Sequence, residues 1–299
     1  MASPKLRAFR GRVIYVVVSA LGFVVRLLPL PVARGFGVLL GAFGSFVAAG
    51  PLRRARANLA LAYPDWSSRK RRAVSRAICR HLGGVFAEFL WLPRVDAKTL
   101  ARTTTYEGME HITGRTSGQI AITAHSGNWE WAAHAIGALA PVTTMQRERN
   151  EPEINRLITR MRARSNVRAI DRGSVAASRE MIRALRDGHL LAFLIDQNIR
   201  AESVKVPFFG RPALTPIGPA RLAIRAEVPV VVIFDERREG KHLVRILPPI
   251  TTSKGDDPVA LTARITALIE EQIRRAPEQW VWFHDRWRER PKWDVTPSS

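Results

Sequence analysis

At 299 residues, the chain can bury a large core as one domain, or as a domain with a short appendage. Its 46% hydrophobic and 24% charged residues are typical of a globular protein and argue against disorder. A formal net charge of +21 indicates an anionic partner (nucleic acid, an acidic membrane, or an acidic carrier or substrate), unless it reflects only an Arg-rich surface. The single cysteine, Cys79, excludes an internal disulfide and a cysteine-based metal site, and we expect it to be structural.

Two apolar runs, residues 13–25 and 36–49, lie in a region that is otherwise basic. Each is shorter than the roughly 20 residues that span a bilayer. Arg26 and two prolines follow the first run where a signal peptide would need a small-residue cleavage site, so a cleaved signal is disfavoured. We expect residues 1–50 to form a retained segment that dips into or crosses the membrane once, followed by a cytoplasmic domain over residues 51–299. The alternative is a pair of buried core helices.

The rest of the chain alternates between helical and strand patterns. Apolar residues at helical spacing predict a helix over residues 67–92, with Ser67 or Ser68 as its cap. Short, β-branched apolar runs predict strands at residues 119–124, 190–195, 229–234 and 242–247. Further helices are expected at residues 130–139, 153–165, 175–187 and 219–226. This alternation predicts an α/β fold with a largely buried central sheet flanked by helices.

The sharpest chemical feature is the junction around His125. An apolar strand ends at His125, Gly127 permits a tight turn, and Glu130 lies in the first turn of the next helix. Catalytic groups gather beyond the carboxyl ends of strands in open α/β sheets. We expect Glu130 to hydrogen-bond the imidazole of His125, fix its tautomer and raise its basicity, as suits a general base.

This junction has three other interpretations. A metal site made by His125, Glu130 and His134 lacks the spacing of known zinc motifs, and we expect neither a metal nor a cofactor. Ser126 lacks the Gly-x-Ser-x-Gly context of a nucleophile. A purely structural histidine at a strand end is the third alternative.

His125 with Glu130 five positions later resembles the His-x4-acid motif of the lysophospholipid acyltransferase superfamily. More narrowly, the chain resembles the lipid A late acyltransferases (lauroyl and myristoyl transferases) and their mycobacterial relatives that acylate phosphatidylinositol mannosides. The motifs that carry this resemblance follow one another along most of the chain: Asn58-Leu59, Tyr63-Pro64, Arg164-Ser165-Asn166, Asp171-Arg172, Asp196-Gln197-Asn198, Val206-Pro207-Phe208-Phe209-Gly210 and residues 276–284.

The resemblance implies a mixed central sheet of the glycerolipid acyltransferase type and a catalytic pair of His125 and Glu130. The imidazole would take the proton from the acceptor hydroxyl, with no covalent acyl-enzyme. An arginine downstream of the motif assists in related enzymes; Arg164 matches it best and Arg147 second, to stabilise developing charge or hold a phosphate.

Four more residues are expected at the substrate. Asp196 ends a strand as His125 does, and it either lines the same cleft or caps the next segment. Asn128 lies within the motif turn. Phe208 and Phe209 form the wall of an acyl groove or the core beneath it.

The implied function is a membrane-bound acyltransferase at the cytoplasmic face of the cell inner membrane. Its donor is expected to be an acyl-ACP thioester, whose acidic carrier suits the basic residues 69–80, and its acceptor a lipid A-type or related glycolipid. An acidic position occupied by Glu130 rather than by Asp favours a glycolipid over lysophosphatidic acid. The alternative is an acyl-CoA-dependent glycerolipid or phosphatidylinositol mannoside acyltransferase.

A basic nucleic-acid-binding protein is the distant alternative, but RRM, KH and zinc-finger patterns are missing and no nucleic-acid partner is expected.

Overall fold

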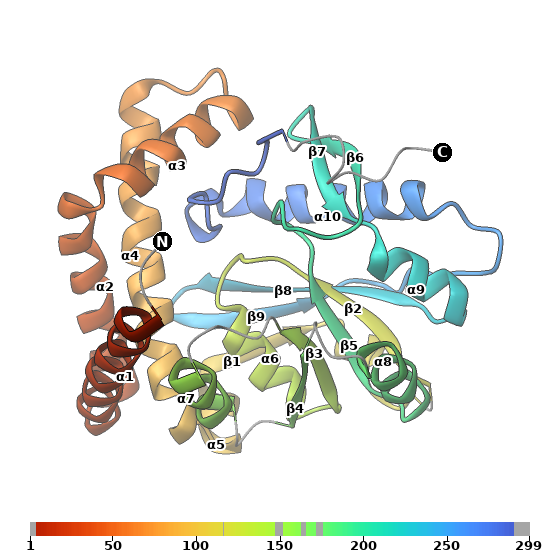
Figure 1. Cartoon of the computed structure of the whole chain (residues 1–299), viewed down its shortest axis with the longest axis horizontal. Coiled ribbons are helices and arrows are strands. Elements are labelled where there is room, and N and C mark those ends of the chain that lie inside the picture. Colours follow the sequence, from red (N-terminus) through yellow and green to blue (C-terminus); the bar gives the residue numbers. More distant parts are fainter. Residues whose placement is uncertain (1–3, 116, 147–151, 163–165, 172–175, 290–299) are drawn as a thin grey trace.

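The computed structural model describes residues 4–115, 117–146, 152–162, 166–171 and 176–289. Within them, a central sheet lies between two layers of helices, and the first four helices form a block beside one edge of it (Figure 1). The helices are α1 (Pro4–Leu27), α2 (Leu30–Val47), α3 (Ala49–Ala62), α4 (Ser68–Trp91), α5 (Ala97–Thr103), α6 (Trp129–Gly137), α7 (Pro152–Arg162), α8 (Ala177–Arg186), α9 (Gly218–Ala226) and α10 (Pro258–Arg275).

The strands form one large sheet and one hairpin. They are β1 (Thr104–Glu107), β2 (Gln119–Thr123), β3 (Val142–Gln146), β4 (Val167–Asp171), β5 (Leu190–Leu194), β6 (Ser203–Phe208), β7 (Arg211–Pro216), β8 (Val230–Arg238) and β9 (Lys241–Ile246). The large sheet has the order β1-β9-β8-β2-β5-β3-β4, and β6 pairs only with β7. Every pair in the large sheet is parallel except β8 with β9, so the sheet is mixed, as the resemblance implied.

The central strand β2 is buried on both faces. Ile120 and Ile122 pack into the core under α9 and α10, whereas Ala121 packs into the core that includes Trp131 of α6. A strand covered by helices on both sides has no polar face, which explains why the three middle residues of β2 are all apolar. Its neighbours β8 and β5 pair with it in parallel, so the carboxyl ends of β2 and β5 meet at one edge of the sheet.

The predicted α/β architecture is confirmed. The helix expected at residues 67–92 is α4, and the Ser67 side chain accepts the amide of Lys70 at 3.2 Å as its N-cap. The expected strands correspond to β2, β5, β8 and β9, and the other expected helices to α6, α7, α8 and α9, all within a few residues.

The two N-terminal apolar runs belong to α1 and α2, and α2 lies along α4 with the two backbones in contact. A Cβ atom added to Gly41 would lie 2.1 Å from the carbonyl oxygen of Cys79, and one added to Gly37 would lie 2.3 Å from that of Gly83. Only glycine permits this approach. One face of α2 is therefore seated on α4. Among the described residues, α2 is also the helix that is long and apolar enough to cross a membrane.

Candidate active site

His125 lies at the carboxyl end of β2, beside the carboxyl end of β5. β5 ends at Leu194, and the chain reaches Asp196 two residues later. Because the two strands are parallel neighbours, residues that follow them come together at one edge of the sheet. The fold thus brings together two residues that are 71 positions apart in the chain.

The side chain of Asp196 holds His125 at two points. Oδ1 of Asp196 lies 2.9 Å from Nδ1 of the imidazole, and Oδ2 accepts the main-chain N–H of His125 at 2.9 Å. Oδ2 also accepts the indole N–H of Trp280 at 2.8 Å. An ionised carboxylate can only accept hydrogen bonds, so Nδ1 carries a proton and Nε2 is the basic nitrogen.

The electrostatics of this pair favour a basic imidazole. Burial would raise the pKa of Asp196, but the charge and hydrogen bond of His125 and the bond from Trp280 hold it at about 2. Burial would lower the pKa of His125, but the charge and hydrogen bond of Asp196, with a further contribution from Glu130, raise it above its usual value. A carboxylate on Nδ1 that increases the proton affinity of Nε2 is the arrangement of a general base.

Glu130 has a different partner from the one expected. Its carboxylate is bound in a bidentate manner by Arg162 of α7, with Nε at 2.9 Å from Oε2 and Nη2 at 2.6 Å from Oε1. The expected hydrogen bond from Glu130 to His125 is not formed; Asp196 orients the ring, and Glu130 acts on it only through its charge. Arg164 and Arg147 lie outside the described residues.

Three residues predicted to bind substrate lie in buried positions. Asn128 is buried; its Oδ1 accepts the amide of Trp131 at 3.0 Å and caps α6, while its Nδ2 donates to Glu88 at 2.9 Å. Phe208 and Phe209 belong to the core cluster between the sheet and α10, and neither lines the cavities described below. Asp196, predicted either to line the cleft of His125 or to cap the next segment, has a fully buried carboxylate that contacts the imidazole.

Two cavities meet at His125. The first, of about 960 Å³, is walled mainly by apolar side chains of α4, α6, β2, β3 and β5, and His125, Glu130 and Arg162 are among its polar groups. The second, of about 1380 Å³, lies between α8, α9 and the segment after β5. Four arginines line this second cavity: Arg179, Arg183, Arg186 and Arg225. The imidazole therefore borders two largely apolar cavities, and the second of them also carries these four arginines.

Two side chains near the site that could in principle act as nucleophiles, Ser126 and Cys79, are poorly placed for that role. Ser126 is buried, and its backbone pairs with that of Trp280. Cys79 is also buried, and burial raises the pKa of its thiol, which disfavours the reactive thiolate. Within the described part of the chain, no cluster of three His, Cys, Asp or Glu side chains could hold a metal ion. The arrangement suits proton transfer between two bound substrates.

Comparison with known proteins gives a consistent result. The profile of the family described as bacterial lipid A biosynthesis acyltransferase matches residues 2–289. A lipid A biosynthesis lauroyltransferase of Escherichia coli is 29% identical over 276 residues, covering 89% of this chain and 88% of that protein. A lipid A biosynthesis acyltransferase of Haemophilus influenzae is 27% identical over 283 residues, covering 91% and 88%.

More distant relatives have other names. A phosphatidylinositol mannoside acyltransferase of Mycobacterium tuberculosis is 25% identical over 216 residues, covering 69% of this chain and 67% of that protein. The crystal structure of a 1-acyl-sn-glycerophosphate acyltransferase from Thermotoga maritima superposes with a TM-score of 0.41 at 16% identity, covering 90% of this chain and 99% of that chain.

Proposed function

The chain belongs to the bacterial lipid A biosynthesis acyltransferase family and is an acyltransferase, and we propose that it moves a fatty acyl chain from an acyl-ACP thioester to a hydroxyl of a lipid A-type glycolipid. The observation that carries this proposal is the hydrogen-bonded pair of His125 and Asp196 at the meeting point of two largely apolar cavities, one of which is also lined by four arginines. A related glycolipid, such as a phosphatidylinositol mannoside, is the second acceptor class, because relatives with that name match over two thirds of the chain.

In the proposed reaction, His125 is the general base. Nε2 takes the proton of the acceptor hydroxyl as its oxygen attacks the thioester carbonyl, and Asp196 stabilises the imidazolium that forms. When the tetrahedral intermediate collapses, the C–S bond breaks and the imidazolium returns the proton to the departing thiolate. Arg162 lines the same cavity and is fixed there by Glu130, and a guanidinium so placed stabilises a developing oxyanion.

The two cavities suit the two ends of such substrates. The first cavity has the size and the apolar lining of a site for a hydrocarbon chain. The second cavity carries four arginines against two acidic residues, Asp187 and Glu202, and this charge suits phosphate groups. Both the acceptor headgroup and the phosphopantetheine arm of the donor carry phosphate. Arg179→Gln and Arg225→Gln should raise the KM of whichever substrate places its phosphate there.

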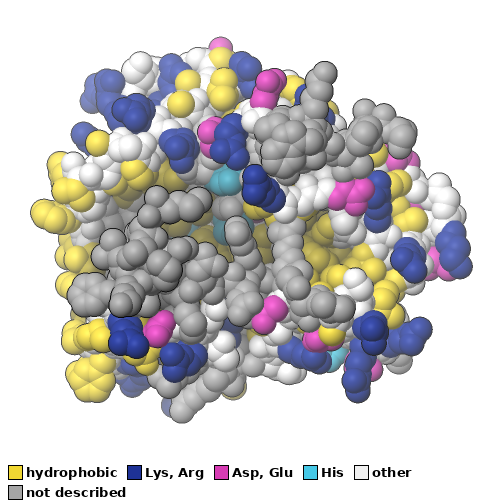
Figure 2. All heavy atoms as spheres, in the orientation of Figure 1, with side chains coloured by type: hydrophobic (Ala, Val, Ile, Leu, Met, Phe, Trp, Pro, Cys, Tyr) yellow, Lys and Arg dark blue, Asp and Glu magenta, His cyan; other side chains and the backbone are white. Residues whose placement is uncertain are grey.

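The proposed membrane surface is formed by α1 and α2, within the proposed membrane-associating segment of residues 1–50. Large apolar side chains are exposed along these helices, at the edge of the molecule where Figure 2 shows hydrophobic side chains gathered. Leu39, Phe43 and Phe46 are 69%, 70% and 77% exposed, which is typical of a surface with an apolar partner. We assign this face to the cytoplasmic leaflet of the inner membrane, with residues 51–299 as the catalytic domain.

The donor assignment rests on charge. Arg69, Lys70, Arg72, Arg76 and Arg80 are exposed on α4, and an acidic carrier protein complements such a surface. Charge-reversing substitutions along this helix should lower the rate with acyl-ACP more than the rate with acyl-CoA.

The proposal is tested with the full-length enzyme on vesicles. Radiolabelled acyl-ACP and acyl-CoA are offered separately with a lipid A-type glycolipid, a phosphatidylinositol mannoside and lysophosphatidic acid. We expect label from acyl-ACP to enter the lipid A-type glycolipid. Label that enters only lysophosphatidic acid, or no lipid at all, would contradict the proposal. Label in the phosphatidylinositol mannoside alone would assign the second acceptor class.

A further inference from the structure

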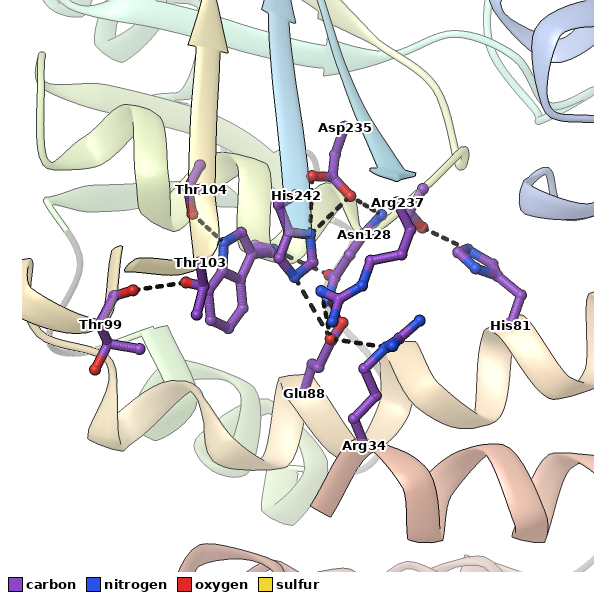
Figure 3. Close-up of polar contacts among 12 residues, drawn as sticks. Arg34, His81, Glu88, Thr99, Thr103, Thr104, Asn128, Asp235, Arg237 and His242 are labelled. Carbon is purple, nitrogen blue, oxygen red and sulfur yellow. Dashed lines mark hydrogen bonds and ion pairs between the residues drawn. The ribbon is translucent and has the colours of Figure 1, made fainter. Parts of the chain in front are cut away.

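A group of buried charges packs against the turn of residues 126–129, which joins His125 to Glu130 and is called the catalytic turn here. None of these charges has a role in the reaction proposed above. It comprises Arg34 of α2, Glu88 of α4, Asp235 and Arg237 of β8, and His242 of β9 (Figure 3). We call these five residues the buried charge cluster. The cluster joins α2 and α4 of the helical block to strands β8 and β9 of the sheet. α2 also carries the exposed apolar face.

Glu88 is the centre of the cluster. Its Oε1 lies 2.9 Å from Nη1 of Arg237, 3.3 Å from Nε of Arg34 and 3.5 Å from Nε2 of His242. Burial would raise the pKa of this carboxyl, but the nearby charges of His242 and Arg237 and a hydrogen bond from Asn128 lower it to about 2. Glu88 is therefore a buried anion at neutral pH.

The cluster grips the turn that separates His125 from Glu130. Oε2 of Glu88 accepts Nδ2 of Asn128 at 2.9 Å, and Oδ2 of Asp235 accepts the main-chain N–H of Asn128 at 2.7 Å. Gly127 has a φ of +62°, and a Cβ atom there would lie 1.8 Å from the carbonyl oxygen of Asp235. The turn therefore has no room to shift towards β8.

A neighbouring contact holds the turn from α4. Nε2 of His81 donates to the carbonyl oxygen of Gly127 at 3.1 Å (Figure 3). His125 lies two residues before Gly127, and Glu130 lies two residues after Asn128. The positions of the imidazole and of the carboxylate that holds Arg162 thus depend on this short piece of backbone.

Stability alone does not account for such a cluster. Buried ion pairs are often no more stabilising than well-packed apolar side chains, because removing the charges from water offsets their attraction. The Oε1 atom of Glu88 and Nη1 of Arg237 face each other as an ion pair without an aligned hydrogen bond. The arrangement instead fixes the geometry, because each charged side chain is neutralised by its neighbours in only one position.

Arg34 connects this geometry to the lipid-facing helices. It is the only described member of the cluster that comes from α1 or α2, and its side chain is 31% exposed whereas that of Glu88 is 2% exposed. α2 is seated on α4 through its glycines, so the place of Arg34 depends on how α2 is seated. A displacement of α2 would withdraw one of the cations that hold Glu88 against Asn128.

We propose that Glu88 is a positioning residue for the acyl transfer. Through Arg34, the contact of Glu88 with the catalytic turn depends on how α2 packs against α4. This inference rests on the proposed function for its kinetic consequences. Its structural consequence, a looser turn when Arg34 is lost, does not depend on any reaction.

The kinetic test compares Arg34→Gln with Arg34→Lys and with Arg53→Gln, an exposed arginine of α3 outside the cluster. We expect Arg34→Gln to lower kcat about 3- to 10-fold at unchanged vesicle binding, within the range of coupling energies between linked sites. Arg34→Lys should restore kcat to within about twofold because it returns a cation to Glu88. Arg53→Gln should leave kcat unchanged. Equal values of kcat in Arg34→Gln and Arg53→Gln would overturn the proposal.

A second pair of variants acts on Glu88 itself. Glu88→Gln should lower kcat by about 10- to 100-fold with little change in KM, since a small misplacement of catalytic groups costs this much. Asn128→Ser keeps a side-chain oxygen to cap α6 but removes the donor to Glu88, and it should lower kcat in the same direction. If Glu88→Gln does not fold, Asn128→Ser decides; a wild-type kcat in either folded variant would contradict a positioning role.

Amide hydrogen exchange separates this inference from the proposed function. We expect faster exchange at the amides of residues 127–132 in Arg34→Gln than in Arg53→Gln, whether or not any acyl transfer is detected. If the wild-type enzyme transfers no acyl group but the exchange difference is found, the proposed function fails and the coupling stands. Identical exchange in the two variants would refute the coupling even in an active enzyme.

Discussion

Two histidine–aspartate pairs are built on this sheet, and their local geometry is nearly the same. Nδ1 of His125 lies 2.9 Å from Asp196, and Nδ1 of His242 lies 3.0 Å from Asp235. In both pairs burial lowers the pKa of the histidine, but the aspartate more than compensates and raises it above its usual value. By the criteria of an activated imidazole, both rings qualify.

The difference lies at the other nitrogen. The side chain of His125 is 26% exposed and lines both cavities. The side chain of His242 is fully buried, its ring is stacked on Trp131 at 4.4 Å, and its Nε2 lies 3.5 Å from Glu88. We therefore expect that a carboxylate on Nδ1 is not sufficient for catalysis, and that a substrate must also be able to reach the ring.

The largest effect is expected from His125→Ala. Loss of the general base should lower kcat by about 10⁴-fold. The melting temperature should fall as well, because the fully buried carboxylate of Asp196 loses its partner. Steady-state turnover and thermal unfolding of the same preparation measure both quantities. Turnover within a factor of ten of the wild type would remove His125 from the mechanism.

His242→Gln should lower stability strongly, with a loss of kcat far smaller than that of His125→Ala, because His242 belongs to the buried charge cluster and not to the two cavities at His125. It leaves Asp235 and Glu88 without the cation between them, and breaking a buried ion pair costs about 3–5 kcal/mol of unfolding free energy. Denaturant unfolding measures the loss. His189→Gln is the control, because His189 bonds only to the neutral Thr143 hydroxyl and should cost about 1 kcal/mol. Equal losses in the two variants would show that His242 carries no essential charge.

Asp196→Asn tests the orientation of the base. The amide can donate to Nδ1 and thereby leave the proton on Nε2, so kcat should fall by about 10³-fold. The wild-type enzyme needs a neutral imidazole, so its activity should decline as the pH falls through the raised pKa of His125. In the variant that pKa drops, and the acidic limb of the pH–rate profile should move to lower pH. An unmoved limb would argue against Asp196 as the partner of the base.

Glu130→Ala should have a smaller effect than Asp196→Asn, about 10²-fold on kcat. It releases Arg162 from its bidentate anchor and removes the weaker of the two carboxylate contributions to the pKa of His125. Glu130→Gln retains one acceptor for Arg162 and should lose less. If Glu130→Ala lost more activity than Asp196→Asn, Glu130 would act on the reacting groups more directly than its contacts indicate.

Local patterns in the sequence predicted the elements that carry their own signals. The capped amphipathic helix α4 and the apolar strand β2 are examples, and the junction at His125 followed from them. The polar strand β3, with two threonines among its five residues, did not stand out. The amphipathic helix α10 was missed although Asp257 caps it and a proline follows at its first position.

The site depends on information that spacing does not contain. Asp196 and His125 meet because β5 lies beside β2, and strand order was not predictable. Sequence neighbourhood favoured Glu130 as the partner of His125, but Glu130 instead binds an arginine of α7. The Arg-rich stretch around Arg164 offered no reason to prefer Arg162. Burial decided the role of Asn128, whose side chain is as plausible in a cleft as in a helix cap.

The meeting of two separate cavities at a single imidazole has a kinetic consequence. Each cavity can bind its own ligand while the other cavity is occupied. Donor and acceptor can therefore form a ternary complex with the enzyme before the acyl group is transferred. Rates measured at several fixed concentrations of one substrate should then give intersecting rather than parallel double-reciprocal lines. The product would occupy both cavities at once, so its departure, rather than bond making, is a natural bottleneck for turnover.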